Sequence, residues 1–151
     1  MAAQAASEMI FFIGAVIISA SLVGVFFAAV SQVSDSIDQS AADAVSASQA
    51  DVTILNDPAH VVYNNTSQNF SLWVKNTGSR QLSVNHTVIL LDSLALANNT
   101  YNWSFVGNHS AWTPEVTVAF TLTGVNLTAN QDHFLKVIAE FGATDSQEFF
   151  W

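Results

Sequence analysis

Residues 9–30 read MIFFIGAVIISASLVGVFFAAV, and this stretch decides the fold. Its 22 residues contain no charged side chain and no proline. A helix of this length rises about 1.5 Å per residue and just crosses a bilayer core of about 30 Å. No proline follows before Pro58, so we expect the helix to continue to about Ala50 as a stalk rich in Ala, Ser and Asp. The chain is therefore expected to be anchored in a membrane or polymerised through this helix.

Composition limits what the remaining residues can do. The 151 residues leave room for one domain of about 100 residues behind the helix. Twelve acidic side chains stand against three basic ones, Lys75, Arg80 and Lys136, which argues against a nucleic acid or an anionic lipid surface as partner. Cysteine is absent, which excludes a disulfide framework, thiolate chemistry and cysteine metal sites.

Glycosylation sequons indicate on which side of the membrane the domain lies. The positive-inside rule gives no answer, because no Lys or Arg flanks residues 9–30. The pattern N-x-S/T marks an exposed acceptor in a secreted domain. It occurs at Asn64, Asn65, Asn69, Asn85, Asn98, Asn102, Asn108 and Asn126. The alternative is that Asn and Thr are simply frequent in the loops of a β-rich domain. We expect a single span with the N-terminus inside and the domain outside.

Small residues in the apolar run indicate helix association. Ala20, Gly24 and Ala28 recur every four residues on one face, and Ala15 and Ser19 add a neighbouring stripe. This small-xxx-small spacing lets two helices approach closely. It predicts self-association or bundling, with a lone lipid-facing anchor as the alternative.

The stalk and the start of the apolar run each allow two interpretations. Val33 and Ile37 fall near heptad seam positions, which suits either a spacer or the inner layer of a filament. Glu8 precedes the run. Its carboxylate could be favoured by the helix macrodipole, or it could pair with the α-amino group of a neighbouring subunit.

From Asp51 the apolar periodicity changes from that of a helix to that of strands, so we place the domains at residues 1–50 and 51–151. The seven candidate strands are residues 51–55, 70–76, 81–91, 101–105, 116–123, 134–141 and 148–151. Residues 133–142 and 144–151 would form the last hairpin. We predict an α+β chain: a long N-terminal helix, then an immunoglobulin-like all-β sandwich.

No chemistry is evident in the sequence. His60, His86, His109 and His133 lie in four different segments and are expected on the surface or in loops. The carboxylates Asp92, Glu115 and Glu140 are far apart, and no nucleotide or nucleophile motif occurs. We expect no enzyme, no catalytic residues, no cofactor and no metal.

An interface should therefore carry the function, and two parts of the domain could supply it. One is the apolar C-terminal stretch 149–151, which either packs inside the sandwich or meets a partner. Another is the region 101–112. Trp103, Trp112 and Trp151 could also form a carbohydrate platform, although core or edge positions are expected for them.

Four segments carry a family resemblance: SEMIFFIGA at residues 7–15, VSDSID at 33–38, DVTILNDP at 51–58 and VKNTGS at 74–79. Together they resemble the FlaG (ArlG) family, a component of the archaellum, within the archaeal type IV pilin-like proteins. The resemblance implies a membrane-anchored stator subunit of the archaeal cell membrane. Its sandwich would lie in the pseudoperiplasm, between the membrane and the S-layer.

The resemblance also implies partners. Such proteins form a short filament or ring with a sister protein, FlaF (ArlF), whose domain binds the S-layer, and the pair holds the motor static. Residues 1–7 hold neither the basic residue nor the glycine of a prepilin leader, and no signal-peptide pattern precedes the run, so we expect an unprocessed N-terminus. One alternative is a pilin or archaellin whose leader is already absent, in an extracellular filament. Another is a tethered module that binds envelope glycan or protein.

Overall fold

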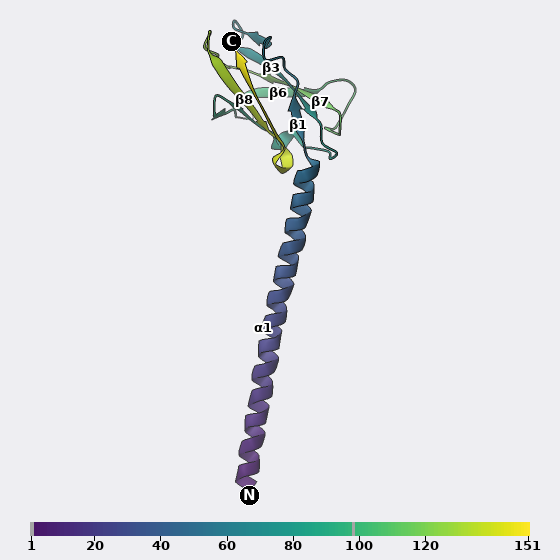
Figure 1. Ribbon diagram of the computed structural model, residues 1–151, viewed down its shortest axis with the longest axis vertical. Helices are drawn as coiled ribbons and strands as arrows, with labels where there is room; N and C mark the ends of the chain where they lie inside the picture. Colours follow the sequence, from purple (N-terminus) through teal and green to yellow (C-terminus); the bar gives the residue numbers. More distant parts are fainter. Residues whose placement is uncertain (1, 98) are drawn as a thin grey trace. The chain divides into compact units, whose positions relative to one another are not determined.

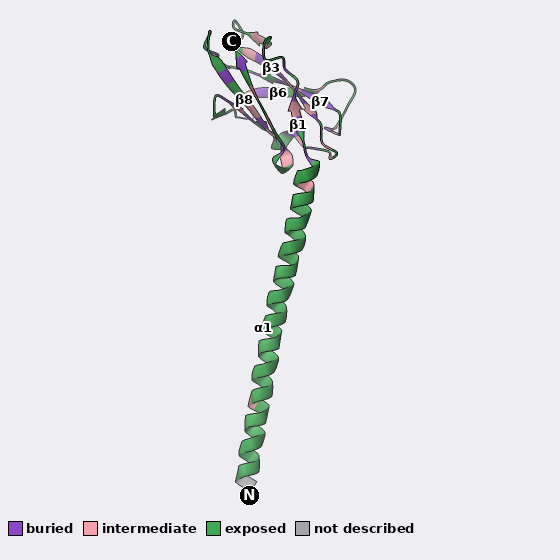
Figure 2. Cartoon of the chain, viewed as in Figure 1, coloured by how far each residue is buried: buried purple, intermediate pink, exposed green. Residues whose placement is uncertain are grey.

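The computed structural model describes residues 2–97 and 99–151, with no side-chain description for residues 2 and 3. Helix α1 spans Ala2–Gln49 without interruption (Figure 1). Its 48 residues correspond to about 70 Å at about 1.5 Å per residue. Almost all of its described side chains are exposed, whereas the buried residues gather on the strands (Figure 2).

The chain forms two compact units, one ending at Ala42 and the other running from Asp43 to Trp151. The last turns of α1 therefore belong to the same unit as the strands. This unit contains two antiparallel sheets. The first, here called the β3 sheet, has the order β1-β3-β7-β6 with β2 also paired to β3, and the second, the β8 sheet, has the order β5-β4-β8-β9.

The strands of the β3 sheet are β1 (Val52–Ile54), β2 (Tyr63–Asn64), β3 (Asn69–Asn76), β6 (Tyr101–Phe105) and β7 (Thr117–Leu122). Those of the β8 sheet are β4 (Val88–Leu91), β5 (Leu94–Ala95), β8 (Asp132–Ile138) and β9 (Thr144–Phe150). Two short 3-10 turns, Val84–His86 and Glu140–Gly142, join strands.

The core lies between the two sheets because alternate strand residues point inward. Leu72 on β3 and Phe120 on β7 are completely buried, as are Ile89 on β4 and Leu135 on β8. The indole of Trp112 fills the same core and donates from Nε1 to the Val116 carbonyl at 3.1 Å. The predicted architecture of one long helix followed by antiparallel sheets is confirmed.

Two details of the predicted strands differ. Residues 81–91 were expected to form one strand, but a 3-10 turn interrupts them because Ser83 N–H donates to the Glu140 carboxylate at 2.8 Å and Leu82 bridges to Trp112. Strands β2 and β5 were not predicted. The turn before β5 is made by Asp92 and Ser93, both with positive φ, without the glycine that usually signals such a turn. The last hairpin is confirmed, since β8 pairs with β9 along their full lengths.

Candidate assembly surfaces

The apolar surface of α1 between Met9 and Val30 is left uncovered by residues 2–97 and 99–151. Phe11 is 83% exposed, and the other large apolar side chains of this stretch are exposed as well. The hydroxyl of Ser21 donates to the Ile17 carbonyl at 2.9 Å, so it needs no external partner in an apolar medium. By length and composition α1 can cross a membrane, and none of its apolar window is buried in the chain. Lipid or other helices must cover this surface.

The small residues predicted to mediate helix association lie on this open surface. Ala15, Ser19 and Ala20 line a shallow groove together with larger neighbours such as Phe12. At Gly24 a Cβ atom would meet nothing within 4 Å, so the isolated chain does not require glycine there. Glycine costs a helix about 1 kcal/mol relative to alanine. A close approach by another helix would explain its use, and the association remains a prediction.

Glu8 is exposed and makes no hydrogen bond or ion pair with the residues that the structure describes. Because α1 begins at Ala2, Glu8 lies beyond the first helical turn, where the macrodipole acts most strongly. The dipole interpretation is weakened by this position. Pairing of Glu8 with the terminal amine of another subunit remains a prediction.

The C-terminal end of α1 is bound directly to the loop that follows β3; we call this contact the joint. Ser79 N–H donates to the Gln49 carbonyl at 2.9 Å, and Thr77 and Gly78 N–H both donate to the Asp51 carbonyl at 3.1 Å. A Cβ on Gly78 would lie 2.4 Å from the Gln49 carbonyl oxygen and 2.6 Å from Asp51 N. The loop thus supplies donors to the carbonyls of Gln49, the last helical residue, and of Asp51 just after it. Gly78 lies so close to the Gln49 carbonyl oxygen that no side chain would fit between them.

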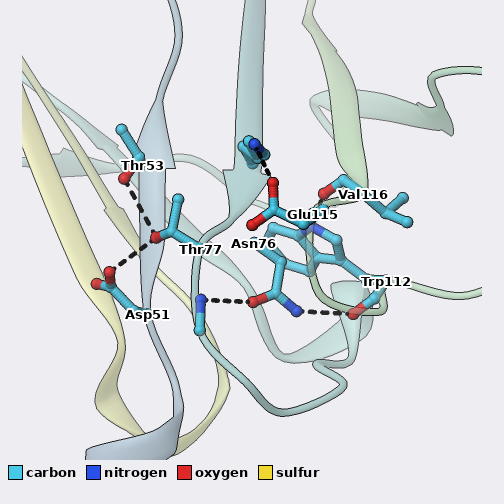
Figure 3. A network of polar contacts seen from close by, with 9 residues as sticks. Asp51, Thr53, Asn76, Thr77, Trp112, Glu115 and Val116 are labelled. Atoms are coloured by element: carbon cyan, nitrogen blue, oxygen red, sulfur yellow. Dashed lines mark hydrogen bonds and ion pairs between the residues drawn. The ribbon is translucent and has the colours of Figure 1, made fainter.

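The side-chain amide of Asn76 fixes the loop of the joint through hydrogen bonds on both of its ends (Figure 3). It is completely buried, and its Nδ2 donates to the carbonyls of Arg80 at 2.8 Å and Trp112 at 3.0 Å. Its Oδ1 accepts from Gly78 N–H at 3.1 Å. Each of these bonds satisfies a buried polar group. The amide therefore holds the loop in the shape that receives the helix end.

Side chains on either side of this loop reinforce the joint. Thr77 Oγ1 donates to the Asp51 carboxylate at 2.7 Å and lies 3.2 Å from Thr53 Oγ1 (Figure 3). Arg80 donates from its guanidinium to Ser46 Oγ at 2.9 Å. The same guanidinium lies 4.2 Å above the centre of the Phe141 ring, a cation–π geometry. The VKNTGS segment is thus the part of the sandwich that grips the helix end.

Of the two predicted contact regions of the domain, the C-terminal stretch is largely used internally, whereas most of region 101–112 is exposed. Phe149 is buried, and Trp151 packs edge-on against Tyr63 with ring centroids 4.9 Å apart, so only Phe150 of the C-terminal stretch is exposed. In region 101–112, Trp112 is in the core and Trp103 on β6 is 42% exposed. A platform of all three tryptophans is therefore not formed, because Trp112 presents no face to solvent.

One histidine contradicts the expectation of surface or loop positions. His60, His86 and His109 are exposed, but His133 is 5% exposed and its ring stacks on Phe149 at 5.6 Å. Its Nδ1 lies 2.7 Å from the Asp92 carboxylate, and its Nε2 lies 3.0 Å from the Thr128 carbonyl oxygen.

Both neighbours of the His133 ring are acceptors, so the ring bonds both only as an imidazolium. Burial alone would lower the pKa of His133, but the bonds to Asp92 and to the Thr128 carbonyl outweigh it and raise the pKa above its ordinary value. The His133–Asp92 pair was not predictable from the sequence, because Asp92 lies 41 residues earlier, directly after strand β4.

The other isolated carboxylates also have structural partners. Glu115 forms an ion pair with Lys75, and Glu140 binds Ser83 N–H and lies 3.2 Å from His86 Nδ1. Within residues 2–97 and 99–151, no three metal-ligating side chains come together. The charged groups of the sandwich thus hold turns and strands in place.

The sequons lie at accessible positions wherever the structure describes them. Asn64, Asn65, Asn85, Asn102, Asn108 and Asn126 are exposed, and Asn69 is half-buried. Asn98 lies outside the described residues. Asn64 Oδ1 accepts from Thr66 N–H at 2.9 Å, so the oxygen of this side chain, and not its amide nitrogen, makes the local hydrogen bond. Glycosylation remains a prediction.

A long helix whose apolar surface is left open by the described residues, followed by a domain of two antiparallel sheets, is the architecture of a structural protein that assembles through its helix. The archaeal-type flagellin family model matches residues 2–149, so the chain belongs to this family of structural proteins. The chain is also 26% identical over 148 residues to flagella-related protein G of Methanocaldococcus jannaschii, which covers 94% of this chain and 92% of that protein. The resemblance to archaellum proteins is thereby confirmed.

Two solved structures are similar. The archaeal flagellum of Methanospirillum hungatei strain JF1 matches with a TM-score of 0.66 and 14% identity, over 95% of this chain and 91% of that one, and shows the shared fold. The archaellum periplasmic stator protein FlaG from Sulfolobus acidocaldarius matches with a TM-score of 0.48 and 15% identity, over 66% of this chain and 99% of that one.

Proposed function

We propose that this chain is a stator subunit of an archaellum, anchored in the membrane by residues 9–30 and without enzymatic activity. It would assemble with copies of itself through α1 and, with a FlaF-like partner, link the motor to the S-layer. The joint carries this proposal: Gly78, Asn76 and Arg80 clamp the end of α1 to the sandwich. A clamped joint transmits torque, whereas a flexible linker would not.

The proposed location is the archaeal cell membrane, with the sandwich in the pseudoperiplasm. Exposure of the described sequons supports a domain outside the membrane, because a glycan needs an accessible asparagine. The similarity to flagella-related protein G supports a role in the archaeal flagellum.

Self-association would use the faces of Ala20, Gly24 and Ala28 and of Ala15 and Ser19. All five residues are exposed, and no other residue that the structure describes covers this part of the helix. The open position of Gly24 supports this face, because a neighbouring backbone could approach it closely.

A subunit of an extracellular filament is the second candidate. It is favoured by the shared fold with the archaeal flagellum of Methanospirillum hungatei, which extends over 95% of this chain. Both candidates bundle apolar helices and place the sandwiches outside, so the fold does not separate them.

Shearing of native cells separates the two candidates. Surface filaments are sheared off and collected, and the protein is quantified in filaments and in cell envelopes, with its N-terminus read by mass spectrometry. A stator subunit stays with the envelope. Enrichment in the sheared filaments would overturn the stator proposal in favour of the filament subunit.

A further inference from the structure

The outward face of the β8 sheet is unusually apolar; we call it the β8 face. Strand register places Val88 opposite Ile138, Leu90 opposite Lys136, and Asp132 opposite Phe150. Val88 is 41% exposed and Phe150 58%. Phe134, two residues before Lys136 on the same face, is 37% exposed. Five apolar side chains therefore share one exposed surface.

The outward face of the β3 sheet has a different character. Outward positions on its two central strands are Ser71 opposite Thr121, Trp73 opposite Ala119 and Lys75 opposite Thr117, so polar side chains predominate. Lys75 is paired with Glu115. Polar side chains of this kind suit contact with water, so the apolar character of the β8 face is not a general property of this sandwich.

Two opposite charges, Lys136 and Glu148, lie unpaired on the β8 face, and Asp132 is a third charge near its end. Lys136 stands between Leu90 and Ser146 across the strands, and Glu148 stands opposite Phe134, two residues further along β9. Among the residues that the structure describes, neither Lys136 nor Glu148 forms an ion pair or a side-chain hydrogen bond. Arg80, by contrast, is bonded to Ser46.

We infer that the β8 face is a contact between two copies of this chain, in which Lys136 of each copy meets Glu148 of the other. A two-fold axis between the stacked faces, passing midway between these side chains, creates two identical ion pairs. The five apolar side chains then surround the charges and exclude water from them.

Charge favours a second copy over another partner. The chain has a net charge of −9, so most of its surface repels a copy of itself. On the β8 face Lys136 and Glu148 cancel, and reciprocal pairing satisfies both at once. Asp132 lies at the far end of the face, opposite Phe150, beyond the proposed pairs.

The size of the face indicates a weak contact. Four strands about 4.8 Å apart, with residues spaced about 3.4 Å, give a face on the order of 300 Å². A standard interface buries about 800 Å² on each partner. The contact therefore depends on copies already held close together by α1, which raises their effective concentration. In this respect the inference rests on the self-assembly in the proposed function.

Cysteine crosslinking tests the contact, because the natural chain has no cysteine. Ser146 lies beside Lys136 on the face and close to the proposed axis. In native membranes, Ser146→Cys is expected to form a dimer of this chain on mild oxidation. Thr121→Cys is the matched control: this position is exposed on the β3 sheet, and the variant should form no dimer under the same oxidation. Equal dimer yields from the two variants, or crosslinking of Ser146→Cys to a different protein, would overturn the inference.

Charge exchange tests the pairing itself in the Ser146→Cys background. Lys136→Glu or Glu148→Lys alone turns two attractions into two repulsions, and we expect the dimer yield to fall roughly tenfold. The double exchange restores both pairs and should restore the yield. The control combines Lys136→Glu with Asp132→Lys, and it should not restore the dimer yield. A double exchange that fails to recover the yield would contradict the proposed geometry.

The two proposals can fail separately. If shearing releases the protein with the filaments while the double exchange still restores the dimer, the stator proposal is wrong and the face contact stands. If the protein stays with the envelope and Ser146→Cys forms no dimer, the face contact is wrong and the stator proposal is untouched.

Discussion

Replacement of Asn76 by Asp changes the joint by a single group while keeping the volume of the side chain. In the native chain, Asn76 Nδ2 donates to the carbonyl oxygens of Arg80 at 2.8 Å and Trp112 at 3.0 Å. In Asn76→Asp a carboxylate oxygen faces both carbonyls: the Arg80 carbonyl loses its donor, whereas the Trp112 carbonyl keeps Leu82 N–H at 3.0 Å. The buried carboxylate oxygen that replaces Nδ2 also lacks a donor. An unsatisfied buried polar group costs about 1–3 kcal/mol, and a charged one more, so we expect a loss of about 4 kcal/mol in unfolding free energy at neutral pH.

The loss should depend on pH in a defined direction. Burial against two carbonyl oxygens disfavours the ionised form, so the pKa of the introduced carboxyl is raised above its unfolded value of about 3.9. Below about pH 3.9 the group is protonated in both states and can donate to one carbonyl. As pH rises from there, the unfolded state ionises first and the loss grows until the folded state also ionises. We expect about half of the loss to disappear in acid.

Tryptophan fluorescence during guanidinium unfolding of the full chain in detergent measures this effect, because all four tryptophans lie beyond residue 72. The variant is compared with the native chain at about pH 3.5 and about pH 7.5, which removes pH effects common to both. Asn99→Asp, in an exposed turn, is the control and should change stability by less than about 0.5 kcal/mol. A pH-independent difference, or equal stability of Asn76→Asp and the native chain at pH 7.5, would refute the reasoning about the joint.

Four further changes test other parts of the chain. Gly78→Ala should lower the unfolding free energy by about 2–4 kcal/mol, because its Cβ meets two backbone atoms, whereas Gly124→Ala should cost only about 1–2 kcal/mol for its positive φ. Gly24→Leu should reduce crosslinked oligomers in membranes while the protein still resists alkaline extraction; unchanged oligomer size would contradict helix packing at this face. The pKa of His133 is raised in the folded state, so its stabilisation should be complete at pH 6 and fall as pH rises through the folded pKa, and this fall should vanish in His133→Gln. Glu8→Gln should impair assembly seen by electron microscopy if Glu8 pairs with a neighbouring subunit, and normal assembly would leave that pairing without support.

Features set by neighbours in the chain were predictable from sequence. The apolar run and the absence of proline before Pro58 determine α1, because helix formation depends on local length and composition. The alternation of Phe70, Leu72 and Val74 with polar residues determines the buried face of β3, since strand side chains alternate with a period of two.

Features set by distant contacts were not predictable. Residues 81–91 have the composition of a strand, but the bond from Ser83 to Glu140 bends them into a 3-10 turn. The VKNTGS segment signals only a turn, and the role of Asn76 requires Trp112, 36 residues away. Likewise, the lone charges of the β8 face become neighbours only through the register of β8 with β9. Periodicity identifies strands and their faces but not their partners.

The position of the joint explains how a load on the helix end could spread through the sandwich. The loop that receives Gln49 continues directly from β3, which pairs with β1, β2 and β7 and is therefore central to its sheet. From β1, Ile54 N–H donates to the Asp145 carboxylate on β9 at 2.7 Å. Gln147 Nε2, also on β9, donates to the Asn56 carbonyl at 2.8 Å. A force entering at Gln49 thus reaches both sheets through hydrogen bonds as well as through the core, whereas the covalent link to the edge strand β1 alone would load only the β1–β3 pairing. We therefore expect variants of the joint to impair motility before they impair membrane insertion.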